Sequence, residues 1–162
     1  IINALKIKPN FICIVPENRK EITTEGGLNL ENNKKKIKEI ITKFKRKKIR
    51  TSLFVNPTIK DIKISNLLNT DCVEIHTGKL ANLVKQNKDF SKELKKIKDC
   101  SNLANKMGIE VHAGHGLDYK TTRLLSKFKQ IKEFNIGHFL IGESIKAGIF
   151  NVIKNFKEII KK

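Results

Sequence analysis

Short apolar runs alternate along the chain with longer segments whose apolar residues recur at helical spacing. This pattern predicts strands that alternate with helices. The expected strands are residues 11–15, 50–55, 72–76, 110–113 and 134–136. The expected helices are residues 31–48, 58–68, 80–107, 119–128 and 149–161, with a short turn of helix at 141–147 and a helix tail at 1–7. Within the region 80–107, a second part is expected to start at Asp89 or Ser91. The unbroken apolar run at 11–15 predicts a strand buried on both faces.

The expected connections all run from strand to helix to strand, without the turn signals of a β-hairpin. Such an order demands parallel strands joined by crossovers, which is an α/β architecture. Two folds fit five strand–helix units: a five-stranded doubly wound sheet, or part of a (β/α)8 barrel that lacks three units. At 162 residues the chain has room for one domain, so residues 1–162 are treated as a single domain.

The formal net charge of +18 allows a basic nucleic-acid-binding protein as an alternative function. Only four of the 34 basic residues are Arg, however, and Arg is the preferred residue for bidentate contacts to phosphates and bases. Ile and Asn are abundant alongside Lys. We therefore favour a biased surface composition and expect no nucleic-acid partner.

The three cysteines, Cys13, Cys72 and Cys100, are far apart in the sequence. Two of them fall inside apolar strand-like runs, where a free thiol behaves as a small hydrophobic group. We expect reduced cysteines in a cytoplasmic protein. No apolar run approaches the roughly 20 residues of a membrane span, so no membrane partner is expected.

Histidine and glycine gather where the fourth expected strand ends, in the segment His112-Ala113-Gly114-His115-Gly116. Two further histidines, His76 and His138, also lie at expected strand ends, so all four histidines of the chain share this location. Parallel α/β folds bind ligands at the carboxyl edge of the sheet. Glu74 interrupts an otherwise apolar strand and is a candidate for the same edge.

Two kinds of ligand fit these residues. A zinc ion could be held by Glu74, His76, His112 and His115, but no pair of them has a familiar helical spacing, and we expect no metal. A phosphate group fits better, because glycine leaves backbone N–H groups bare before a helix, and helix N-termini attract anions. An anion-binding α/β module is therefore a further alternative.

Motifs along the whole chain resemble the pyridoxine 5'-phosphate synthase family. They are Val15-Pro16-Glu17, Thr23-Thr24-Glu25-Gly26-Gly27-Leu28, Glu74-Ile75-His76-Thr77-Gly78, Ala113-Gly114-His115-Gly116-Leu117 and Asn135-Ile136-Gly137-His138. The resemblance implies a (β/α)8 (TIM) barrel that assembles as a homo-octamer. It also implies a transferase-type condensation of 3-amino-2-oxopropyl phosphate with 1-deoxy-D-xylulose 5-phosphate, which releases inorganic phosphate and water without a cofactor.

The resemblance also implies a role for individual residues. His115 matches the family's proton donor, and Glu74 matches the residue that stabilises cationic transition states. Thr23 matches a contact to the deoxyxylulose phosphate. Gly116, Gly137 and His138 match the binding site of the aminoketone phosphate.

The sequence departs from the family in three ways. Counterparts of the first three barrel strands, with the family's proton-accepting His and Glu, are missing, so we expect an incomplete barrel of five units that is inactive by itself. A piece of a longer protein is the simplest explanation, and a truncated gene is the other. His112 stands where the family more usually has Asn, and Glu143 stands where a basic residue is common, which would weaken anion binding nearby unless its carboxylate faces away.

Overall fold

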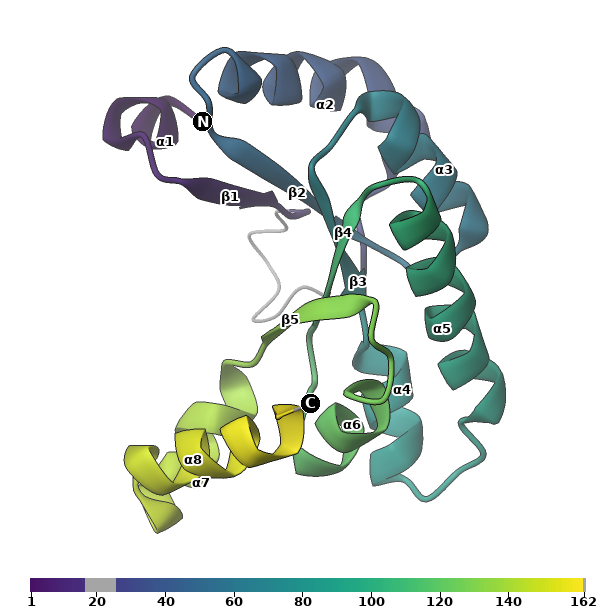
Figure 1. Cartoon of the computed structure of the whole chain (residues 1–162), viewed down its shortest axis with the longest axis vertical. Helices are drawn as coiled ribbons and strands as arrows, with labels where there is room; N and C mark the ends of the chain where they lie inside the picture. Colours follow the sequence, from purple (N-terminus) through teal and green to yellow (C-terminus); the bar gives the residue numbers. More distant parts are fainter. Residues whose placement is uncertain (17–25, 162) are drawn as a thin grey trace.

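The computed structural model describes residues 1–16 and 26–161, which form a curved parallel sheet covered by helices (Figure 1). Thr23 lies outside the described residues. The strands are β1 (Phe11–Ile14), β2 (Arg50–Val55), β3 (Cys72–His76), β4 (Glu110–Gly114) and β5 (Ile131–Asn135). The helices are α1 (Ile2–Ile7), α2 (Leu30–Lys45), α3 (Ile59–Leu68), α4 (Gly78–Lys85), α5 (Ser91–Lys106), α6 (Tyr119–Leu125), α7 (His138–Ala147) and α8 (Ile149–Ile160).

The five described strands are all parallel and follow the sequence order β1-β2-β3-β4-β5. Right-handed crossovers that always step in the same direction place every connecting helix on the same face of the sheet. Figure 1 shows α2, α3 and α5 together on that face, and α2 and α5 pack on β2 and β4. A doubly wound sheet would reverse its strand order. The observed order is therefore that of a (β/α)8 barrel, and the doubly wound alternative is wrong.

The two faces of the sheet differ in chemistry because successive side chains of a strand point to opposite sides. The helix-covered face carries the hydrophobic core, in which the strand residues are Leu53, Val55, Val73, Ile75, Val111, Ala113 and Ile131. The strand residues between them face the concave side and are largely polar. Glu74 pairs in register with His112, and His76 pairs with Gly114. The concave face is therefore available for a binding site.

Three expectations about the elements need correction. The first strand is half-buried rather than buried, and Val15 beyond it is 48% exposed, because β1 is an edge strand of the described sheet. The fifth strand begins at Ile131, three residues earlier than expected. Helix α7 begins directly at His138. The expected helical region at 80–107 consists of two helices, α4 and α5, and the second begins at Ser91, one of the two expected start positions.

The surface of α7 and α8 bears large apolar side chains that are exposed, including Ile145 at 85% and Phe150 at 77%. Contiguous exposed apolar surface commonly marks a place where another part of a protein or another subunit packs. Among the described helices, none is long and apolar enough to cross a membrane.

Candidate functional site

Glu74 lies on the concave face of β3 and is held by residues from both edges of the described sheet. The Cys13 thiol of β1 donates to Glu74 Oε2 at 3.5 Å, and the Asn135 side chain of β5 also hydrogen-bonds the carboxylate. Both β1 and β5 are two strands away from β3. Neighbouring strands are about 4.8 Å apart, so short side chains from both edges reach Glu74 only because the sheet curves around it.

Gly114 on the neighbouring strand makes room for the Glu74 carboxyl group. A Cβ atom at position 114 would overlap Glu74 Oε1 and would lie 2.9 Å from Glu74 Cδ. Burial raises the pKa of Glu74, and the hydrogen bonds from Cys13 and Asn135 only partly oppose this effect. A half-buried carboxylate with a raised pKa is stabilised by a cation that enters the site.

His115 follows β4 in a left-handed backbone conformation, with φ of 77°. The buried Thr77 hydroxyl, just after β3, shares its proton between the carbonyl oxygens of Gly114 (2.8 Å) and His115 (2.7 Å). The Thr77 N–H also donates to the Gly114 carbonyl at 2.9 Å. These bonds tie the ends of β3 and β4 together and hold an unusual backbone geometry in place.

The imidazole of His115 stacks on that of His76, with ring centroids 4.7 Å apart and an interplanar angle of 22°. Phe54 contacts the His76 ring edge-on at a centroid distance of 5.3 Å. Gly78 is required beside this stack, since a Cβ there would lie 2.7 Å from His115 Cδ2 and 2.8 Å from His76 Cε1. The stack and the turn together fix an imidazole at the carboxyl edge, where it can transfer protons to a ligand.

Bare backbone follows both β4 and β5. Gly116 is exposed and has φ of 74°, and a Cβ on it would lie 2.9 Å from Ala81 Cβ. Gly137 is the N-cap residue of α7, and His138 is the first residue of the same helix; both are exposed. Because the first N–H groups of a helix lack intrahelical acceptors, the start of α7 can bind an anion. Glu143 belongs to the second turn of α7, beyond these N–H groups.

His112 does not belong to the carboxyl edge as expected. It lies in the middle of β4, is only 1% exposed and bonds to Glu110 at 2.8 Å. The side chains weighed as an alternative zinc site at the carboxyl edge are therefore not gathered: His76 and His115 stack at the edge, whereas His112 lies deeper in the sheet. Among the described residues, the one group of three with metal-binding geometry is Cys72, Glu110 and His112.

Three residues to which the sequence assigned no role in the site support it. They are Cys13 and Asn135, which bond to Glu74, and Thr77, which fixes the turn before His115. Asn135 offered a signal, because it is a polar residue at a strand end and immediately precedes Ile136-Gly137-His138. Cys13 lies in an apolar run, and nothing in the sequence around it indicates a role for its thiol in the site.

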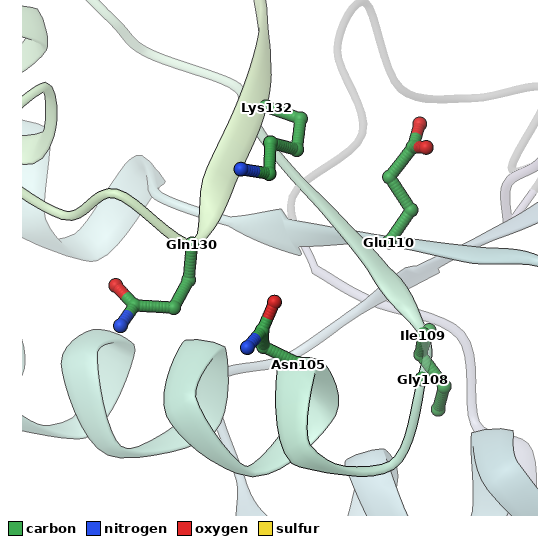
Figure 2. Close-up of a pocket in the computed structure, with 6 residues that line it drawn as sticks. All are labelled: Asn105, Gly108, Ile109, Glu110, Gln130 and Lys132. Atoms are coloured by element: carbon green, nitrogen blue, oxygen red, sulfur yellow. The ribbon is translucent and has the colours of Figure 1, made fainter.

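A cavity of about 250 Å³ lies elsewhere, between the end of α5 and the beginnings of β4 and β5 (Figure 2). Asn105, Gly108, Ile109, Glu110, Gln130 and Lys132 line it. This is the amino end of the strands, opposite to His115. In Figure 2 the Glu110 carboxylate points away from Asn105 and Gln130. The cavity is therefore separate from the carboxyl-edge site.

Fold and site together define a barrel-type β/α protein that presents a carboxyl group, an imidazole and bare helix-start backbone at its carboxyl edge. The entire chain, residues 1–162, matches the model of the family described as pyridoxal phosphate biosynthesis protein PdxJ. The chain belongs to this family, whose (β/α)8 fold agrees with the observed sheet.

Similar proteins carry a more specific name. The chain is 66% identical over 159 residues to pyridoxine 5'-phosphate synthase of Pelagibacter ubique. It is 42% and 41% identical over 157 residues to the enzymes of that name from Prochlorococcus marinus and Sulfurihydrogenibium. These matches cover 97–98% of the chain but only 66%, 64% and 64% of the three relatives. The chain thus spans about two thirds of their length.

Proposed function

We propose that these residues form the proton-donating and phosphate-binding side of a pyridoxine 5'-phosphate synthase. The reaction is the condensation of 3-amino-2-oxopropyl phosphate with 1-deoxy-D-xylulose 5-phosphate, a transferase-type ring closure in vitamin B6 biosynthesis. The similar proteins carry the name of this enzyme, and the residues at the carboxyl edge have the chemistry that the reaction needs.

The strongest support for the proposal is the position of the Glu74 carboxyl group, which occupies the space that Gly114 leaves free. An amine that condenses with a ketone passes through cationic, iminium-like intermediates. A carboxylate in a half-buried site, supported by Cys13 and Asn135, stabilises such a cation more strongly than one in water. Burial disfavours the charged form of Glu74, as its raised pKa indicates. The cationic intermediate offsets that cost.

His115 acts in this proposal as the general acid. Elimination of water requires a proton for the departing hydroxyl, and imidazole transfers protons efficiently near neutral pH. The Thr77 hydrogen bonds and the stack on His76 hold the His115 ring in place. Substrate binding therefore costs little conformational entropy of this side chain.

The bare backbone at the carboxyl edge is proposed to bind phosphate. Gly116, Gly137 and His138 supply exposed N–H groups and a polar ring at the ends of two adjacent strands, β4 and β5. This is the place where (β/α)8 barrels often bind the phosphate group of a ligand. Thr23, assigned to the other substrate's phosphate by resemblance, remains a proposal outside the described residues.

The complete enzyme is proposed to need more than these 162 residues. The family's proton-accepting His and Glu have no counterpart among them, so we expect the chain alone to form no product. Strands β1 and β5 each pair with one neighbour in the described sheet, and α7 and α8 expose apolar side chains. Further barrel units and a homo-octameric assembly would cover these surfaces. The free thiols of Cys13, Cys72 and Cys100 suit a cytoplasmic enzyme.

A hybrid enzyme tests the proposed function. Residues 1–162 would replace the corresponding segment of the Pelagibacter relative, and pyridoxine 5'-phosphate formation from the two substrates would be measured. We expect product from the hybrid and none from the 162-residue chain. A correctly folded hybrid without activity, beside an active parent, would contradict the proposal.

A further inference from the structure

A second cluster of reactive side chains lies on the concave face, toward the amino end of the strands. Cys72 begins β3, Glu110 pairs with it at the start of β4, and His112 follows two residues later on the same face. Their thiol, carboxylate and imidazole ligand atoms all lie within 4.8 Å of one another. His112 Nε2 is 2.8 Å from Glu110 Oε1, and Cys72 Sγ is 3.9 Å from the same oxygen.

The imidazole of His112 is oriented as a metal ligand would be. The residue is 1% exposed, and its Nε2 faces the other two ligand atoms. Its Nδ1 lies 3.6 Å from Glu133 Oε1 of β5 and has no hydrogen-bond partner among the described residues. Histidines that bind metals typically turn their second nitrogen toward a carboxylate, which fixes the ring and makes the first nitrogen more basic.

The cluster already attracts a cation. Arg50 Nη2 lies 3.0 Å from Glu110 Oε2 and 3.2 Å from Cys72 Sγ. The guanidinium group is an incomplete partner for this cluster, because it makes no direct contact with His112 Nε2 and reaches it only through Glu110. The Arg50 side chain is 51% exposed and has solvent into which it can swing. A smaller cation could therefore take its place.

We propose that Cys72 Sγ, the Glu110 carboxylate and His112 Nε2 bind a divalent ion such as Zn²⁺, with Arg50 displaced toward solvent. Sulfur, nitrogen and oxygen ligands are those that zinc takes, and three protein ligands leave the fourth position to water. Bond lengths of about 2.0–2.3 Å put tetrahedral ligand atoms roughly 3–4 Å apart, close to the present separations. The site is on the opposite side of His112 from the carboxyl edge and does not depend on the proposed enzymatic reaction.

Binding must release the thiol proton of Cys72 to solvent as the metal–sulfur bond forms. Because binding displaces a ligand proton, affinity should weaken as the pH falls.

Metal titrations of the untagged 162-residue chain test the site. Zn²⁺ affinity would be measured by competition with a chromophoric chelator, and Co²⁺ would report on the ligands through its visible spectrum. We expect one ion per chain and a sulfur-to-cobalt charge-transfer band. That band belongs to the unaltered protein, so it remains decisive even where a variant fails to fold. Its absence would overturn the proposal.

Variants then assign the ligands. Cys72→Ser should abolish the charge-transfer band, and His112→Asn should weaken Zn²⁺ binding at least tenfold. Arg50→Ala should tighten binding, since it removes the competing cation. Cys100→Ser, which replaces a buried thiol on α5, is the matched control and should leave affinity unchanged. If the Cys72 and His112 variants bind Zn²⁺ as tightly as the unaltered chain, or if the Cys100 control binds it more weakly, the ion binds elsewhere.

Discussion

Gly114 and Glu74 should be energetically coupled, because the carboxyl group occupies the space that a side chain at position 114 would need. Gly114→Ala places a methyl group onto Glu74 Oε1, 2.9 Å from Cδ and 3.2 Å from Asn135 Cβ. Forcing extra volume into a packed site costs about 1–3 kcal/mol. Alanine also lowers the conformational entropy of the unfolded chain, which stabilises the folded protein by about 0.4–1 kcal/mol. We expect a net destabilisation of about 1–2 kcal/mol.

A double-mutant cycle separates this overlap from other effects of the substitution. In a Glu74→Ala background the overlapping oxygen is gone, so Gly114→Ala should be neutral or slightly stabilising. Urea unfolding of the four proteins would yield the coupling free energy, expected at about 1–3 kcal/mol. Gly142→Ala is the matched control, because the residue is helical and nothing lies within 4 Å of the position that its new methyl group would take. Equal cost of Gly114→Ala in both backgrounds would refute the packing that we infer for Glu74.

Three further predictions concern the same edge of the sheet. Thr77→Val should lower the free energy of unfolding by about 1–3 kcal/mol, since the His115 carbonyl loses the hydroxyl donor, whereas Thr77→Ser should not; urea unfolding measures both. Asp118→Ala should cost about 1–2 kcal/mol because it removes the capping box of α6, and Asp118→Asn should retain most of the stability in the same assay. The raised pKa of Glu74 means that its ionisation disfavours folding, so the stability of Glu74→Gln relative to the parent should increase from pH 4 to pH 8; a difference independent of pH would count against the burial of this carboxyl group.

Much of the fold follows from short-range patterns in the sequence. The strands β2 and β3 have the expected bounds, because their apolar residues lie on the helix-covered face and Pro57 or Gly78 follows. Strand β5 was harder to delimit. Lys132 and Glu133 are exposed, and the irregular pairing between β4 and β5 breaks the alternation that would reveal a strand.

The site was predictable in its location but not in its contacts. The glycines around His115 indicate a ligand edge because bare backbone has few other uses there. The supports of Glu74 come from strands more than 60 residues away in sequence, and no local pattern records which side chains a curved sheet brings together. His112 shows the limit most clearly: its sequence neighbours suggested the carboxyl edge, whereas the pleat of β4 turns it toward Glu110.

The most direct test of the proposed site is the rate at which the hybrid enzyme with the Pelagibacter relative forms pyridoxine 5'-phosphate when His115 is replaced by Gln. General acid catalysis contributes about 10²–10⁴-fold to a rate, so the account predicts a loss of at least about 100-fold with the fold intact. A His115→Gln hybrid whose rate stays within a few-fold of the unaltered hybrid would contradict it.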